Sequence, residues 1–250
     1  MKRRKTGLLF VVCLQIFTAA AVQAQNPAVA PTPRTEMAWA NRGETWMGRF
    51  YENFRQLRAG DVDLLFIGDS ITHGWERGGS ATFEKYYGHR NAVNLGFGGD
   101  RTQHVLWRLI EGELQEIASS PKVAVVMIGT NNTNSDTPNE IAAGIRAICN
   151  TLRGQLPETK ILLLAIFPRG REAGDWRRSI NEATNSMIAE LDDGEWIHYL
   201  DIGDSFLEPG GDLPETVMPD ALHPNERGYE IWAEAMEATL ARLMGDTPVR

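Results

Sequence analysis

The sequence predicts a single three-layer α/β domain with a parallel, doubly wound sheet, and three observations support this fold class. Apolar runs typical of buried parallel strands recur along the chain, amphipathic helical patterns alternate with them, and glycine-rich turns follow several of the runs. The 250 residues show no internal repeat and no second domain. Five strands are expected, at residues 64–67, 92–95, 123–128, 161–167 and 196–201.

The first 24 residues have the composition of a secretory signal peptide. Four basic residues at 2–5 precede an apolar stretch at 7–21, and Ala24 provides a small residue for cleavage. The apolar stretch is short for a membrane span. We therefore expect an exported protein, periplasmic or secreted, with no stable membrane insertion after cleavage near Ala24.

Composition narrows the range of partners. Removal of residues 1–24 leaves 21 basic and 33 acidic residues, a formal charge of −12. Such a balance disfavours nucleic acid and anionic membranes as partners. Only Cys149 remains after cleavage, and its apolar helical neighbours indicate a buried thiol, with no intrachain disulfide.

Two segments are expected ahead of the first strand. Residues 25–35 are rich in proline and alanine, which predicts an extended, disordered linker. Residues 36–58 carry aromatic and leucine side chains at roughly helical spacing, so we expect a helix that packs on the sheet and stops at Gly60. The folded domain is expected over residues 36–246.

Caps and apolar stripes predict the remaining helices. In chain order these are a short helix from about residue 71, one after Asp100, one at 137–153, one at 176–191 and a last one that stops at Gly245. Asp100 is the expected cap of the second, and Ile110 belongs to its core stripe. Thr137 and Glu140 form a capping box for the third. The stretch through residue 79 and the loop at 203–220 are expected to be irregular.

The first strand runs directly into Gly68-Asp69-Ser70. In a doubly wound sheet, ligands bind in the crevice beyond the carboxyl ends of the strands. Ser70 is therefore a candidate nucleophile, and Asp69 is expected to shape the turn that presents it. The same tripeptide also fits an ordinary strand-to-helix turn with a capping serine, so the choice depends on the rest of the chain.

His223 is the best candidate for a general base among the five histidines. It lies just before the last helix, and Asp220, three residues earlier, can accept the Nδ1 proton and fix the tautomer. The chain order Ser, Asp, His is one that α/β hydrolases use. The other histidines are expected to be structural or solvated: His73, His89, His104 and His198.

A tetrahedral intermediate also requires preorganised hydrogen-bond donors. Gly99 can bring a backbone N–H close, Asn131 can offer its side-chain amide, and Ser70 can offer its own N–H. Each turn by itself also fits an ordinary turn, but both follow predicted strands. Ser205 lies in a second Gly-Asp-Ser tripeptide with no helix behind it, so we do not expect it to be the nucleophile. Dinucleotide, Walker and zinc-protease motifs are absent, and no cofactor or metal is expected.

Together these residues resemble the SGNH hydrolase, or GDSL-type esterase and lipase, family. Its four blocks correspond, in order, to Gly68-Asp69-Ser70-Ile71-Thr72, Gly99, Asn131 and the pair Asp220 and His223. Residues 94–100 and 104–109 are most similar to the branch of the platelet-activating-factor acetylhydrolase catalytic subunits. The resemblance implies a flavodoxin-like sheet and metal-independent hydrolysis of short acyl esters, but it does not identify the substrate.

We therefore expect an exported serine carboxylester hydrolase that removes short acyl groups, above all acetyl, from a small-molecule ester such as an acetylated carbohydrate. A phospholipid ester similar to platelet-activating factor is the alternative substrate. An acyltransferase and a non-catalytic carbohydrate- or lipid-binding relative remain as other classes. The sequence leaves the oligomeric state open, a homodimer included.

Overall fold

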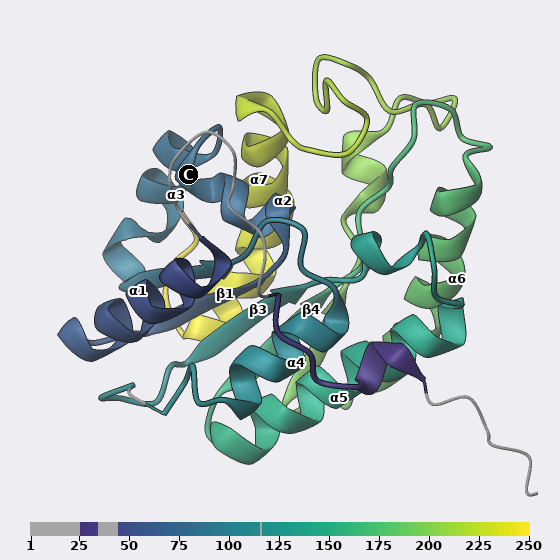
Figure 1. Cartoon of the computed structure of the whole chain (residues 1–250). Helices are drawn as coiled ribbons and strands as arrows, with labels where there is room; N and C mark the ends of the chain where they lie inside the picture. The colour runs from purple at the N-terminus through teal and green to yellow at the C-terminus, as the bar shows by residue number, and fades with distance from the viewer. Residues whose placement is uncertain (1–25, 35–44, 116) are drawn as a thin grey trace, which may run out of the picture.

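A five-stranded parallel sheet forms the centre of the computed structural model, which describes residues 26–34, 45–115 and 117–250 (Figure 1). The strands are β1 Leu64–Gly68, β2 Ala92–Gly96, β3 Val123–Met127, β4 Lys160–Leu164 and β5 Ile197–Leu200. Their order is β2-β1-β3-β4-β5, which is the doubly wound order of flavodoxin-like sheets. The fold prediction is confirmed. The expected signal peptide and residues 36–44 of the expected first helix lie outside the described residues.

The register brings the carboxyl ends of the three central strands to one level. Gly68, the last residue of β1, pairs with Gly96 of β2 on one side and with Met127 of β3 on the other. The strand order reverses between β1 and β3, and such a switch point opens a crevice at the carboxyl edge of the sheet. The turns that follow these three strands therefore face one another.

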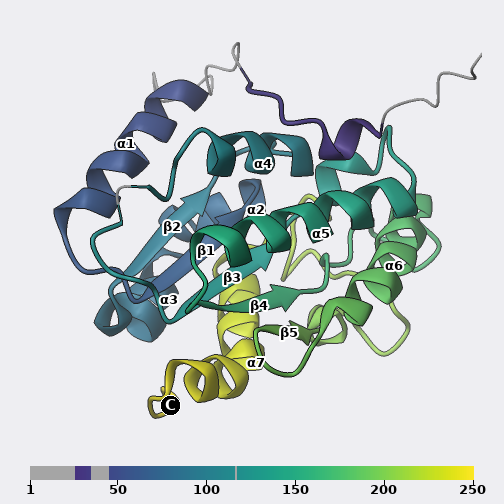
Figure 2. The ribbon, with the colours of Figure 1, turned by 90° about the horizontal axis from the view of Figure 1, so that it is seen from below.

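Helices cover both faces of the sheet, as Figure 2 shows. They are α1 Trp46–Ala59, α2 Ser70–His73, α3 Ser80–Tyr87, α4 Thr102–Ile110, α5 Pro138–Gln155, α6 Trp176–Ile188 and α7 Glu226–Met244. Side chains alternate along β1: Leu65 and Ile67 pack with α4 and α5, whereas Leu64 and Phe66 pack with α3 and α7. Burial of each such side chain stabilises the fold by about 1.5–3 kcal/mol.

Several predicted helix ends are confirmed. The Thr137 hydroxyl accepts from the Glu140 N–H, and the Glu140 carboxylate accepts from the Thr137 N–H at 2.8 Å, so the capping box is complete. α7 stops at Gly245, which has φ +73° and adopts the left-handed conformation that glycine tolerates best. Cys149 is buried in α5 as a free thiol, and burial raises its pKa to about 12.

Two local predictions are wrong, and one helix lies where the sequence analysis expects no element. This helix is α3, residues 80–87, just beyond the expected irregular stretch, and its Tyr86 and Tyr87 are buried in the same aromatic core as α7. Ile110 is 51% exposed, since α4 ends at this residue. Asp100 does not cap α4. Its carboxylate is buried and accepts hydrogen bonds from Trp46 Nε1 at 2.7 Å and Arg108 Nε at 3.1 Å, and the N-cap position is Arg101.

The N-terminal segment, residues 26–34, is packed on the domain where the sequence predicts a disordered linker. Ala28 is completely buried within a short 3₁₀ turn (η1, Pro27–Val29), and its carbonyl accepts from the Thr102 hydroxyl at 2.8 Å. Gly144 of α5 makes this contact possible, because a Cβ there would lie 2.8 Å from the Ala28 carbonyl oxygen. The small residues of the segment thus serve close packing against α4 and α5.

Candidate active site

Ser70 is the first residue of α2 and lies at the carboxyl end of β1. The preceding Asp69 caps this short helix, because its Oδ1 accepts from the Ile71 N–H at 2.9 Å. Gly68 is required at the end of the strand, since a Cβ there would lie 2.4 Å from the Met127 carbonyl oxygen. Asp69 is wholly buried, whereas Ser70 is half-buried and faces a cavity. Asp69 thus shapes the turn, as the sequence suggests.

A hydrogen-bonded relay connects Ser70 with His223 and Asp220. Ser70 Oγ lies 2.8 Å from His223 Nε2, and His223 Nδ1 lies 2.6 Å from Asp220 Oδ2. With the Nδ1 proton directed at the carboxylate, Nε2 is left to accept the proton of the serine hydroxyl. The geometry is therefore that of a nucleophile, a base and an orienting acid.

The Asp220–His223 turn is held by its own main chain. Asp220 Oδ1 accepts from the backbone N–H of Leu222 at 3.1 Å and from that of His223 at 2.7 Å. Ala221, which follows Asp220, has φ +58°, a strained value for a residue with a Cβ. Desolvation raises the pKa of Asp220, but the hydrogen bonds from His223 outweigh it, and the net pKa lies below the ordinary value of 3.8. The orienting carboxylate is consequently charged at neutral pH.

Residues outside the sequence motifs hold the two sides of this relay in space. Arg171 donates from Nη2 to the Pro219 carbonyl at 2.8 Å and from Nη1 to the Met218 carbonyl at 3.3 Å, so it holds the loop just before Asp220. On the other side, the Tyr229 hydroxyl of α7 donates to the Ile71 carbonyl of α2 at 2.7 Å. Both contacts join segments far apart in the sequence, and no local pattern predicts them.

The three expected oxyanion donors border the same cavity. Its volume is about 310 Å³, and its lining residues are Ser70, His73, Gly74, Arg77, Gly98, Gly99, Asn131, Leu222 and His223. Gly99 has φ +74° in a turn closed by the bond from the Asp100 N–H to the Phe97 carbonyl. One N–H of the Asn131 amide donates to the Asp100 carbonyl at 2.9 Å, which orients the side chain and leaves a second N–H.

The remaining candidates lie apart from this relay. Ser205 is exposed in the short turn η6 Gly203–Phe206, and in the described part of the chain no histidine bonds to its hydroxyl. His104 Nδ1 accepts from the Arg101 N–H at 3.0 Å, and the ring of His198 contacts the Glu195 carbonyl. His73 does line the cavity, but its Nε2 is directed to Glu76, 3.6 Å away.

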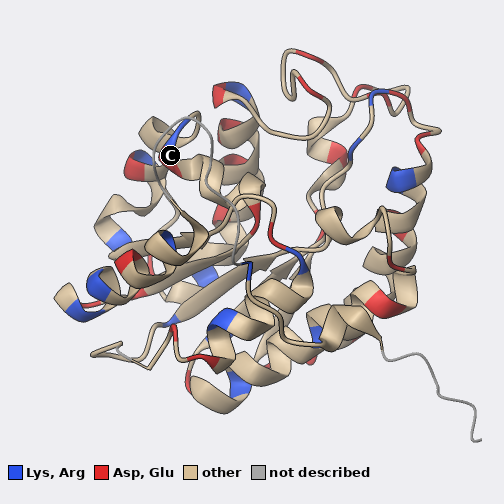
Figure 3. Ribbon diagram, viewed as in Figure 1, with Lys and Arg blue, Asp and Glu red and all other residues tan. Residues whose placement is uncertain are grey.

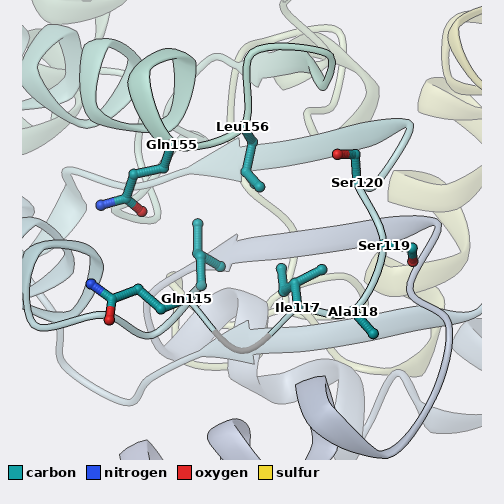
Figure 4. A pocket seen from close by; sticks show the side chains of 8 residues that line it. Gln115, Ile117, Ala118, Ser119, Ser120, Gln155 and Leu156 are labelled. Carbon is teal, nitrogen blue, oxygen red and sulfur yellow. The ribbon is translucent and has the colours of Figure 1, made fainter.

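A separate cavity of about 380 Å³ lies beyond α4, next to the end of α5 (Figure 4). Its described lining residues are Leu114, Gln115, Ile117, Ala118, Ser119, Ser120, Gln155 and Leu156. None of these side chains titrates near neutral pH, and no histidine accompanies the two serines. The described residues that line this cavity therefore provide no base that could activate either serine.

Comparisons with known proteins agree with the fold and with the position of the motifs. Residues 66–231 match the model of the GDSL-like Lipase/Acylhydrolase family. The platelet-activating factor acetylhydrolase IB subunit alpha1 of Homo sapiens is 31% identical over 220 residues, 88% of this chain and 92% of that protein. The alpha2 subunit of Rattus norvegicus is 31% identical over 223 residues, 89% of this chain and 94% of that protein.

Two solved structures share the fold at lower sequence identity. A GDSL-like lipase of Bacteroides thetaiotaomicron superposes with a TM-score of 0.60 at 18% identity, and the alignment covers 77% of this chain and 97% of that chain. An acetylxylan esterase of Geobacillus stearothermophilus superposes with a TM-score of 0.57 at 21% identity, and the alignment covers 77% of this chain and 99% of that chain. The similarity thus extends over most of the described residues.

Proposed function

This chain belongs to the GDSL-like lipase/acylhydrolase family and is an ester hydrolase, and on that premise we propose that it removes short acyl groups by a Ser70–His223–Asp220 mechanism. The observation that carries the proposal is the relay from Ser70 Oγ through the His223 ring to Asp220, with bonds of 2.8 and 2.6 Å at the edge of a cavity. Family membership explains the motifs, and the relay supports the roles proposed for these three residues.

In this mechanism Ser70 Oγ attacks the ester carbonyl carbon while His223 Nε2 takes the hydroxyl proton. The carbonyl oxygen becomes an oxyanion, which the N–H groups of Ser70 and Gly99 and the Asn131 amide stabilise. When the intermediate collapses, His223 gives the proton to the leaving alcohol. Water then attacks the acyl-serine while His223 takes one of its protons, and as the bond to Ser70 Oγ breaks, His223 returns this proton to Oγ and the acid is released. Asp220 holds the imidazole in the productive tautomer throughout.

We place the substrate among acetyl esters, with an acetylated carbohydrate preferred. Two kinds of similar protein act on acetyl groups by name: the acetylxylan esterase of Geobacillus stearothermophilus and the platelet-activating factor acetylhydrolase subunits. A cavity of about 310 Å³ suits a small acyl group. The second name supports the alternative, a phospholipid acetyl ester. Rates on acetylated xylose oligomers and on an acetylated ether phospholipid distinguish the two.

The mechanism is tested by alanine substitutions and 4-nitrophenyl acetate. Ser70→Ala and His223→Ala are each expected to lower kcat by about 10³-fold or more, with little change in thermal stability. Ser205→Ala is the matched control, because it removes the other Gly-Asp-Ser hydroxyl, and its rate should stay near that of the wild type. Loss of activity in Ser205→Ala with retention in Ser70→Ala would exchange the two assignments.

Product analysis separates hydrolysis from the other classes. A hydrolase releases equal amounts of acetate and alcohol when no acceptor alcohol is present, whereas an acyltransferase requires the acceptor. A purely binding relative releases neither product. Equal release that disappears in Ser70→Ala supports the hydrolase.

Export is the remaining part of the proposal. The basic residues at 2–5, the apolar residues at 7–21 and Ala24 support a cleaved signal peptide. No helix in the described parts of the chain is both long and apolar enough to cross a bilayer. Mass spectrometry of the mature protein is expected to find Gln25 as the first residue, in the periplasm or the medium. A full-length chain that stays in the cytoplasm would contradict export.

A further inference from the structure

Three arginines, Arg34, Arg77 and Arg101, line the candidate active site and the cavity beside it. Arg77 borders the cavity that holds Ser70. The second of these two cavities, which is not the one in Figure 4, has a volume of about 400 Å³. It is lined by Arg34, Gly99, Arg101, Gln103, His104, Asn131 and Asn134. The two cavities share Gly99 and Asn131, so they meet at the expected oxyanion donors. The second cavity is therefore placed to receive the part of a substrate that extends beyond the ester group.

The charge of this region is opposite to that of the whole protein. The chain has a formal charge of −8, yet no aspartate or glutamate is among the described residues that line either cavity. Acidic residues gather elsewhere, for example on residues 203–219, which include four of them and no lysine or arginine (Figure 3). A concave site lined by one sign of charge concentrates ligands of the opposite sign.

The buried carboxylate of Asp100 contributes negative charge to this region and acts on Arg34. Asp100 lies behind the wall of the second cavity, wholly buried, and accepts hydrogen bonds from Trp46 and Arg108. The pKa of His104, in the same wall, responds to the surrounding positive charge. Burial, and after it repulsion from Arg34, Arg101 and Arg108, together lower its pKa to about 3. The ring is therefore neutral at neutral pH and adds no charge of its own.

The N-terminal segment is built to bring Arg34 to this place. Ala28 and the bond from the Thr32 N–H to the Gln103 carbonyl at 3.2 Å hold the segment along α4. Arg34 Nη1 then donates to the Gly98 carbonyl at 3.3 Å. A Cβ on Gly99 would lie 2.3 Å from Arg34 Nη1, so the guanidinium lies directly against the turn that carries the Gly99 N–H.

We infer that Arg34 and Arg101 form an anion subsite, and that the natural ester carries a carboxylate or phosphate group on its alcohol portion. A guanidinium presents paired N–H donors that match the geometry of both groups. Arg77 adds positive charge on the side of the Ser70 cavity. This inference rests on the proposed function and extends it: acidic acetylated sugars and phosphate-bearing acetyl esters fit the subsite, and neutral ones do not use it.

The test compares matched acetyl esters that differ in one anionic group. The neutral probe is methyl 4-acetoxybenzoate, and the anionic probes are 4-acetoxybenzoate and 4-acetoxyphenyl phosphate, which separate a carboxylate subsite from a phosphate subsite. Each probe is compared across protein variants, so differences in intrinsic reactivity cancel. Arg34→Gln combined with Arg101→Gln should lower kcat/KM for an anionic probe at least 10-fold more than for the neutral probe. Lysine at both positions should restore much of the difference.

Two controls make the outcome specific. Arg242→Ala removes a charge near the far end of α7 and should leave the ratio of anionic to neutral rates unchanged. Sodium chloride at 0.5 M should reduce the wild-type ratio, because salt screens the subsite charges. An unchanged ratio in the double glutamine variant overturns the subsite while neutral esters are still cleaved. Failure of the wild type to cleave the neutral ester overturns the proposed function instead.

Discussion

Replacing Asp220 with asparagine is expected to slow the enzyme more than replacing it with alanine. In the alanine variant water can occupy the space of the carboxylate, because the Asp220 side chain is 57% exposed. This water can also accept from the N–H groups of Leu222 and His223, so the main loss is the charge-assisted hydrogen bond to the His223 ring, about 1.5–3 kcal/mol and reduced by exposure to solvent. A decrease in kcat of about 10- to 100-fold follows.

Asparagine has two arrangements, and both are unfavourable. If Oδ1 keeps its bonds from the N–H groups of Leu222 and His223, the amide N–H faces His223 Nδ1. The ring proton then moves to Nε2, which can no longer accept the proton of Ser70. If the amide flips, its N–H groups face the two backbone N–H donors, and two hydrogen bonds are lost at about 1 kcal/mol or more each. We therefore expect asparagine to be at least about 10-fold slower than alanine.

The assay is kcat for 4-nitrophenyl acetate at pH 7–8, with thermal unfolding to verify the fold. Asp212 in the same loop provides the matched pair, since it is exposed and, among the described residues, its side chain accepts only a 3.3 Å bond from the Ala173 N–H. Asp212→Ala and Asp212→Asn should both keep the wild-type rate. An asparagine variant at 220 as fast as the alanine variant would refute the reasoning, because the tautomer would then not depend on Asp220.

Two further predictions concern the turn glycine and the buried cap. Gly99→Ala should lower kcat by about 10-fold or more, because a Cβ at φ +74° is strained and lies 2.3 Å from Arg34 Nη1. Gly194→Ala is the control, since Gly194 has φ +70° and nothing lies within 4 Å of a Cβ there. It should lose a similar amount of stability from the backbone strain and keep the wild-type rate. Burial raises the pKa of Asp69 from 3.8 to about 7, so the folded state holds this proton more tightly and loses stability as pH rises through that window, by at most about 4 kcal/mol. Urea unfolding of Asp69→Asn should accordingly lack this pH dependence, and an equal pH dependence of stability in variant and wild type would exclude a raised pKa at Asp69.

Much of the fold follows from local patterns. The apolar runs of β1, β3 and β4 are buried on both faces in the structure, which is the reason that they appear as continuous runs in the sequence. The capping box at Thr137 and the stop at Gly245 depend only on neighbouring residues, and both are confirmed. Such features are predictable because backbone hydrogen bonding and side-chain periodicity act over a few residues.

Failures occur where a residue's partner is distant in the chain. Aspartate is a typical capping residue, but the carboxylate of Asp100 instead accepts a hydrogen bond from Trp46, which lies 54 residues away in the sequence. Residues 26–34 have the composition of a disordered linker, yet Gly144 of α5 leaves room for Ala28 to pack. A short apolar or polar segment gains enough free energy to order only when a complementary surface exists, and the linear sequence does not display that surface.

The sequence by itself determined the sheet, the order of its strands' connections and the residues at their carboxyl ends, because a parallel sheet brings those ends to one edge whatever the loops do. It thus indicated that Ser70 and His223, 153 residues apart, would meet. Only the tertiary structure decided what surrounds them: Arg171 on the loop before Asp220, Tyr229 against α2, and Arg34 against the Gly98–Gly99 turn. Those contacts depend on how separate elements pack, and packing is a property of surfaces in three dimensions.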